Sequence, residues 1–168
     1  MPKLLSFPNP VNETSARLVA GGVVILGATF VGTGNAWILV ALTYGFVARV
    51  LSGPTFSPLG RLVTQVITPS LNVRHRFVPG PPKRFAQGIG AAFTLAAAVL
   101  MFADDPALAR VVIAMLVVAA FLEAVFAVCL GCIVFGWLMK LGVIPQGVCE
   151  ECNNFTTIAS LATETHPA

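Results

Sequence analysis

The sequence predicts an all-α integral membrane protein: a bundle of four transmembrane helices with a short interfacial amphipathic helix in a cytoplasmic loop. Hydrophobic residues make up 57% of the 168-residue chain, charged residues make up 10%, and the mean hydropathy is +0.87. A soluble domain of this length carries roughly a quarter charged residues, so most apolar side chains here need lipid around them. The apolar residues also fall into four segments separated by polar links.

The first two spans are expected to form a helical hairpin. The segment LVAGGVVILGATFV lies in a span of about residues 16–33, and WILVALTYGFVARVL lies in a span of about residues 35–51. Both are near the lower length limit for a helix that crosses a bilayer. The GTGN link between them is so short that the two helices must run antiparallel. Asn12 or Thr14 is the expected cap of the first helix.

The last two spans are expected at about residues 84–103 and 107–132, joined by the turn ADDP. The third is rich in alanine and glycine, which let helix backbones approach closely in a membrane. The fourth apolar segment exceeds one bilayer crossing, so it must tilt, break near Gly131 or leave the lipid. Residues 1–145 are therefore expected to form one transmembrane domain, followed by a tail of residues 146–168.

The connection between the second and third spans predicts the orientation. It contains SPLGRLVTQVITP, whose apolar residues recur at helical spacing after Ser57 as N-cap and Pro58 at the first helical position, as in an interfacial helix. Six of the ten Lys and Arg residues lie between Arg49 and Arg84, without one Asp or Glu. Basic loops remain on the cytoplasmic side. We therefore expect a multi-pass protein of the inner (plasma) membrane with both termini in the cytoplasm. The basic stretch is not expected to bind nucleic acid.

All four cysteines occur in two C-x-x-C pairs, Cys129 with Cys132 and Cys149 with Cys152. Because the cytosol keeps thiols reduced, a structural disulfide is not expected on that side. Three interpretations remain open. Cys129 and Cys132 are the catalytic pair of a thiol redox or sulfur relay, with Cys149 and Cys152 exchanging with them. Alternatively, all four thiolates bind zinc or an iron–sulfur cluster in a non-catalytic membrane anchor, or the cysteines simply pack as small apolar side chains.

The two pairs differ in how well they support a thiolate. Cys129 is expected late in a helix, where the helix dipole disfavours a thiolate. Lys140, the basic loop or a helix break at Gly131 would relieve this. Glu150 and Glu151 disfavour a thiolate in the second pair, which therefore fits a resolving pair or metal ligands better than an attacking nucleophile.

Glu123 is the one acidic residue inside a predicted span. Ionisable residues within a membrane are costly and often functional. We expect a structural ion pair between Glu123 and Arg17 or Arg49, at the inner ends of the first two spans, with a proton relay as the alternative. The sequence contains no P-loop, dinucleotide-binding fingerprint or Ser/His/Asp arrangement.

Three motifs resemble an uncharacterised bacterial integral-membrane family, a domain of unknown function, in what looks like an actinobacterial member. They are PNPVNE…AR near the N-terminus, PGPPKRFAQGIG before the third span, and FAVCLGC at the end of the fourth. The resemblance covers roughly residues 8–135, and RFAQ and CLGC are its most specific parts. It implies four membrane helices, no established activity and a thioredoxin-like or rhodanese-like cytoplasmic partner, and it leaves a homo-oligomer open. Of the cysteines, only Cys129 and Cys132 match the family motif.

Overall fold

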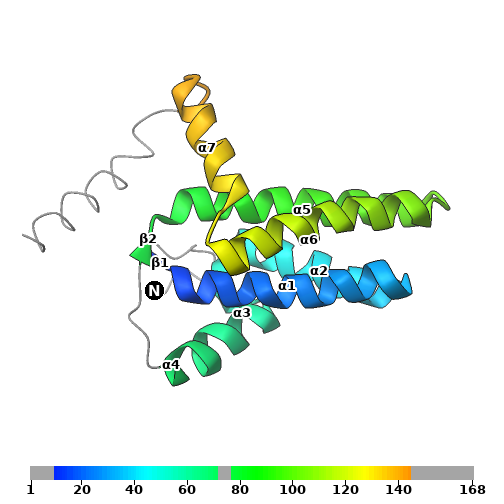
Figure 1. Cartoon of the computed structure of the whole chain (residues 1–168), viewed down its shortest axis with the longest axis horizontal. Helices are drawn as coiled ribbons and strands as arrows, with labels where there is room; N and C mark the ends of the chain where they lie inside the picture. Colours follow the sequence, from blue (N-terminus) through cyan, green and yellow to red (C-terminus); the bar gives the residue numbers. More distant parts are fainter. Residues whose placement is uncertain (1–9, 72–76, 145–168) are drawn as a thin grey trace, which may run out of the picture.

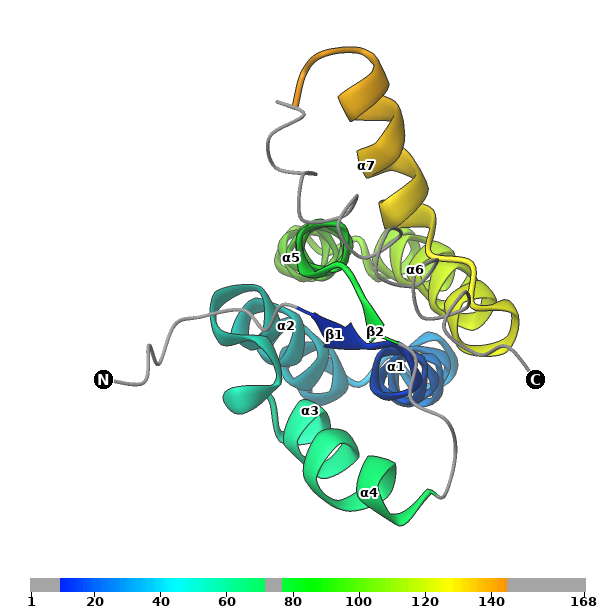
Figure 2. The same ribbon diagram turned by 90° about the vertical axis from the view of Figure 1, so that its left-hand side faces the viewer.

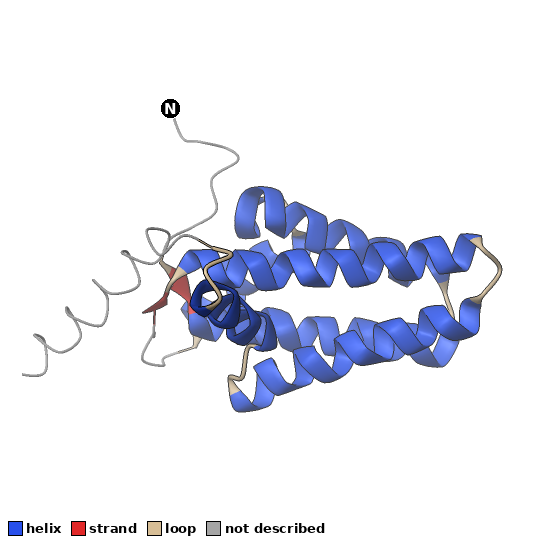
Figure 3. Ribbon diagram, turned by 90° about the horizontal axis from the view of Figure 1, so that it is seen from above, coloured by secondary structure: helices blue, strands red, loops and turns tan. Residues whose placement is uncertain are grey.

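The computed structural model describes residues 10–71 and 77–144, and almost all of these residues are helical (Figures 1 and 3). Four long antiparallel helices form the bundle: α1 (Glu13–Thr33), α2 (Ala36–Ser52), α5 (Gly80–Phe102) and α6 (Pro106–Phe126). Four helical runs are long and apolar enough to cross a membrane, and the second of them begins with α2 and extends to Ser70. The predicted all-α fold class is therefore confirmed.

The helices are packed as two antiparallel hairpins. In the bundle, α1 lies mainly against α6 and α2 mainly against α5, with α5 and α6 also in contact (Figure 2). Buried side chains from all four helices meet at the centre, including Phe30, Leu42, Phe46, Ala97 and Ile113. Large apolar side chains also cover the outside, with Ile25, Val40, Val99 and Met115 each more than half exposed. An apolar exterior of this kind fits lipid as the surrounding solvent.

The two ends of the bundle are different. At one end, which we call the N-terminal end, α1 and α5 begin, α2 and α6 end, and all the remaining elements gather (Figure 1). The opposite end contains only the short links between α1 and α2 and between α5 and α6 among the described residues. The N-terminal end therefore offers most of the irregular backbone on which a site can be built.

The expected interfacial helix is present as a run of short turns. A 3₁₀ turn η1 (Gly53–Thr55) leads to α3 (Pro58–Leu62), a π-helical turn η2 (Val63–Ile67) and α4 (Thr68–Ser70). Ser57 accepts a hydrogen bond from the backbone N–H of Gly60, which confirms it as the N-cap. Val63 is buried, whereas Leu62 and Val66 are exposed. The run thus presents apolar side chains both inward and outward.

A two-residue antiparallel ladder was not expected. The strands β1 (Val11–Asn12) and β2 (Phe77–Val78) pair next to the starts of α1 and α5 (Figure 2). Asn12 also caps α1, because its side chain accepts hydrogen bonds from the backbone N–H groups of Thr14 and Ser15. Of the two expected caps, Asn12 is therefore the one used.

The main departure from the sequence prediction concerns the fourth span. Instead of continuing to residue 132, α6 ends at Phe126, and a new helix α7 (Leu130–Lys140) begins after a three-residue break. The break precedes Gly131 and is made by Ala127, whose backbone is left-handed (φ 58°). The helix α7 then leaves the bundle at a steep angle (Figure 1). The other three helices lie within four residues of their predicted limits.

Candidate functional site

The C-terminal end of α6 is closed by its own backbone and by Arg17. The N–H groups of Ala127 and Val128 donate back to the carbonyl oxygens of Glu123 and Leu122, at 3.1 and 3.2 Å. The Arg17 guanidinium, from α1, donates to the carbonyl oxygens of Ala124 at 3.1 Å and Val125 at 2.9 Å. A cation at a helix C-terminus also compensates the helix dipole. These contacts fix the point at which the chain turns toward the cysteines.

Cys129 and Cys132 are joined by a disulfide at the N-terminus of α7. Cys129 is the N-cap residue, and its sulfur accepts a hydrogen bond from the backbone N–H of Cys132 at 3.3 Å. One sequence expectation is therefore corrected: Cys129 precedes a helix instead of ending one, so the helix dipole favours a thiolate at this position.

The CLGC segment is held against the start of α5 by an unusually close contact. A Cβ atom on Gly131 would lie 2.6 Å from both Cα and Cβ of Ala86, so only glycine fits there. One turn of helix further, the rings of Phe135 and Phe85 pack with their centroids 5.5 Å apart. Gly131 therefore leaves room for the backbone of α5 to approach α7.

Glu123 pairs with Lys83, with Nζ and Oε1 2.6 Å apart. Their side chains are 10% and 16% exposed, so the pair is largely buried. The expected partners were Arg17 and Arg49, and neither forms an ion pair with Glu123 in the part of the chain that the structure describes. Lys83 belongs to the first turn of α5, and the ion pair therefore ties α5 to α6 four residues before the helix break.

Arg49 lies in the last turn of α2 and is almost fully buried. Its Nε donates to Oε1 of Gln87 at 2.9 Å, and its Nη1 donates to the hydroxyl of Ser57 at 3.3 Å. The guanidinium carbon also lies 4.5 Å from the centroid of the Phe46 ring, a cation–π contact. Arg49 thus links α2, α3 and α5 at the N-terminal end.

Cavities adjoin both sides of the disulfide. An open cavity of about 510 Å³ is lined by both cysteines, Lys83, Pro79 and Pro82, among others. A second cavity of about 290 Å³ lies between the long helices and reaches Cys129 and Glu123. Cys129 is 9% exposed, whereas Cys132 is partly exposed. A soluble partner would therefore reach Cys132 more readily than Cys129.

The metal interpretation depends on residues beyond this site. Within residues 10–71 and 77–144, no three His, Cys, Asp or Glu side chains gather closely enough to hold an ion. Cys149 and Cys152, the other two expected ligands, lie outside the described residues. The four-cysteine zinc or iron–sulfur site therefore stays a prediction.

Every residue of the RFAQ motif makes a contact at the N-terminal end of the bundle. Arg84 donates to the carbonyl oxygen of Val50 at 3.0 Å, and Phe85, Ala86 and Gln87 make the contacts described above. Lys83 and Gln87 were not named as site residues from the sequence. The specificity of the motif was the available signal, because RFAQ and CLGC prove to be the two surfaces that pack together.

Comparison with known proteins identifies the family of the chain. Residues 11–140 match the model of a domain of unknown function, DUF4395. The chain belongs to this family. No curated protein and no solved structure matches the chain. The matched region includes RFAQ and CLGC and ends before Cys149, so the site built from Lys83, Glu123, Cys129 and Cys132 lies entirely within the family domain.

Proposed function

We propose that this DUF4395 member is a membrane thiol–disulfide exchange protein whose catalytic pair is Cys129 and Cys132. The observation that carries the proposal is the disulfide at the N-terminus of α7, where Cys129 is the N-cap residue. The helix N-terminus and the N–H of Cys132 stabilise a thiolate on Cys129. The reduced pair therefore forms readily at this position, and its Cys129 thiolate can take part in exchange.

The size of the disulfide loop argues against a purely structural bond. Only two residues separate Cys129 and Cys132, which have a sequence separation of three. In the chain-entropy model, closing a loop this short contributes about 2 kcal/mol, less than the longer loops that structural disulfides usually close. The bond also joins a helix cap to its own helix, so it connects no separate elements of the fold.

The greater exposure of Cys132 than of Cys129 suggests which sulfur is attacked first. A partner thiolate attacks the sulfur of Cys132, the S–S bond breaks, and Cys129 leaves as a thiolate that keeps the hydrogen bond from the Cys132 N–H. A second partner thiolate then attacks the mixed disulfide and releases Cys132. Two electrons pass from the partner to the pair, and the two partner thiol protons end on Cys129 and Cys132. The partner leaves as a disulfide, and the reverse sequence oxidises the pair again.

Two sources of partner thiols are consistent with the sequence. One is a thioredoxin-like or rhodanese-like cytoplasmic protein, and the other is the Cys149 and Cys152 pair of the same chain. The basic residues near the N-terminal end favour the cytoplasmic side of the inner membrane for this end. A rhodanese-like partner would make the reduced pair a sulfur relay. The Cys132 thiolate would attack the outer sulfur of the partner's persulfide, the partner's S–S bond would break, and the partner's cysteine would leave as a thiolate.

The test is the cysteine state of the purified full-length protein. We expect dithiothreitol to reduce the 129–132 bond in the folded protein and oxidised glutathione to restore it, as followed by alkylation and mass spectrometry. Cys129→Ser should accumulate a mixed disulfide on Cys132, whereas Cys132→Ser should accumulate much less on buried Cys129. The double variant Cys149→Ser/Cys152→Ser is the control and should keep the exchange.

Three results would contradict or redirect the proposal. A bond that dithiothreitol cannot open in the folded protein would rule out exchange. Near-stoichiometric zinc or iron with all four thiols protected would instead support the metal-binding anchor. A mass increase of one sulfur atom on Cys132 in protein from cells would identify sulfur transfer as the activity of the pair.

A further inference from the structure

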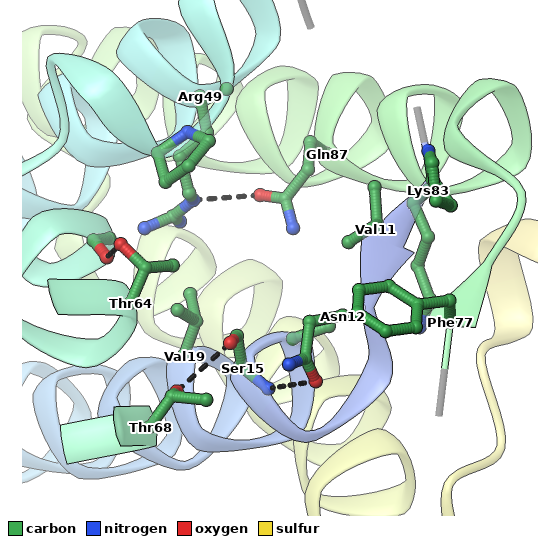
Figure 4. Close-up of a pocket in the computed structure, with 15 residues that line it drawn as sticks. Val11, Asn12, Ser15, Val19, Arg49, Thr64, Thr68, Phe77, Lys83 and Gln87 are labelled. Carbon is green, nitrogen blue, oxygen red and sulfur yellow. Dashed lines mark hydrogen bonds between the residues drawn. The ribbon is translucent and has the colours of Figure 1, made fainter. Parts of the chain in front are cut away.

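A separate cavity of about 300 Å³ opens at the N-terminal end of the bundle, where α1 and α5 begin and α2 ends, beside η2 (Figure 4). Neither Cys129 nor Cys132 lines it. Its walls are mixed, with Val11, Val19 and Phe77 on the apolar side and hydroxyl groups of Ser15, Thr64 and Thr68 on the polar side. The cavity therefore suits a ligand that has both a polar and an apolar part.

Arg49 brings a positive charge into this cavity. The residue is 5% exposed, and Figure 4 shows its guanidinium directed between Gln87 and Thr64. Gln87 and Ser57 accept hydrogen bonds from Nε and Nη1. No acceptor contacts Nη2 among the described residues, so this nitrogen has two N–H groups available to a ligand.

No carboxylate of the described site neutralises this charge through a direct contact. Glu123 is engaged by Lys83 at 2.6 Å, and both Arg49 and Lys83 line the cavity. Among the described residues that line the cavity, Arg49 and Lys83 are cations and none is a carboxylate. An uncompensated buried charge is costly in a protein and more so near lipid. A bound anion would remove that cost.

The hydroxyl groups of the cavity already have hydrogen-bond partners. Ser15 and Thr68 hydrogen-bond to each other at 2.9 Å, and Thr64 donates to the carbonyl oxygen of Gly60 at 2.8 Å. Each hydroxyl oxygen has more than one hydrogen-bonding site, so these groups can still contact a ligand. Arg49 is therefore the determinant of charge, and the hydroxyls add polarity around it.

We propose that this cavity binds a phosphate oxyanion, held by Arg49 and supplied by the headgroup of an anionic phospholipid. Guanidinium groups bind phosphate through paired, charge-assisted hydrogen bonds. The cavity lies at the end of a bundle whose long helices are apolar enough to cross a membrane, and its apolar wall is suited to the part of a lipid next to the phosphate. Basic pockets between membrane helices are a known mode of recognising anionic lipids.

The experiment measures thermal unfolding of the full-length protein in neutral detergent, with phosphatidylglycerol, phosphatidylcholine or inorganic phosphate added. Ligands that bind only the folded state raise the unfolding temperature, and the rise grows with the ratio of free ligand concentration to Kd. We expect a rise with phosphatidylglycerol, and little or none with phosphatidylcholine or phosphate at matched concentration. Arg49→Gln should weaken the apparent affinity for phosphatidylglycerol at least tenfold. Arg61→Gln, which removes an exposed arginine from α3, is the matched control and should not change it.

A second variant covers the case in which Arg49→Gln does not fold. Thr64→Leu keeps the cation but places a larger side chain in the cavity, and it should also abolish the rise. An equal response to inorganic phosphate would reassign the site to a small soluble oxyanion. An equal response to both lipids, or no response to any ligand, would overturn the proposal.

Discussion

Lys83 and Glu123 show how a single residue pair shapes this site. The pair is largely buried, and its two charges come from different helices. Removing one partner of such a pair leaves an uncompensated charge, whereas replacing both partners by apolar residues is often tolerated. Removing one partner is therefore expected to lower the free energy of unfolding much more than replacing both partners by apolar residues.

We predict that Lys83→Met alone, or Glu123→Leu alone, lowers the free energy of unfolding by about 3 kcal/mol. The double variant Lys83→Met/Glu123→Leu should recover most of that loss. The protein is kept in a mild detergent, and its unfolding is followed as a denaturing detergent is added. Lys140→Met, at an exposed position on α7, is the control and should change little. Additive losses in the double variant would show that the two side chains do not interact.

At the scale of the element, α7 is attached to the bundle mainly through α5, and Gly131 lies at a close approach between the two helices. The Cα and Cβ atoms of Ala86 occupy the space that any larger side chain would need. By contrast, Gly136 on the same helix has no atom within 4 Å of its Cβ position. The two glycines therefore provide a matched pair of sites on one helix.

We predict that Gly131→Ala displaces α7 from α5 and lowers the free energy of unfolding by about 1–3 kcal/mol, as is usual for overpacking. In the reduced protein, Cys129 should then react faster with an alkylating reagent, because it loses its cover. Gly136→Ala should leave that rate unchanged and stabilise the helix slightly. Equal alkylation rates in the two variants would mean that α7 does not depend on this contact.

The sequence predicted the elements well because their signals are local. Ser57 followed by Pro58, Asn12 before α1, and four apolar segments each act within a few residues of the chain. The end of α6 had no such signal, since Ala127 is neither glycine nor proline, and the last carbonyl groups of the helix accept hydrogen bonds from Arg17, more than a hundred residues away. The partner of Glu123 was missed for the same reason, because helix rotation decides which cation faces it.

For the whole molecule, the unequal ends of the bundle suggest its orientation. Arg17, Arg49, Arg61, Lys83 and Arg84 lie at the N-terminal end, together with the disulfide and both proposed sites. The opposite end has Arg110 beside two aspartates, Asp104 and Asp105. Because positively charged segments remain inside, the N-terminal end is expected to face the cytoplasm. A thiol pair on that side would exchange with cytoplasmic partners.

We test this orientation with single cysteines in a variant whose four native cysteines are replaced by serine. Ala103→Cys lies in the exposed turn after α5, at the opposite end, and Ser70→Cys lies at the exposed end of α4, at the N-terminal end. In intact cells, a membrane-impermeant maleimide should label Ala103→Cys and should label Ser70→Cys only after the membrane is opened. The reverse pattern would place Cys129 and Cys132 on the oxidising side, where disulfides persist. The exchange chemistry would then act on exported thiols, and a cytoplasmic partner would be excluded.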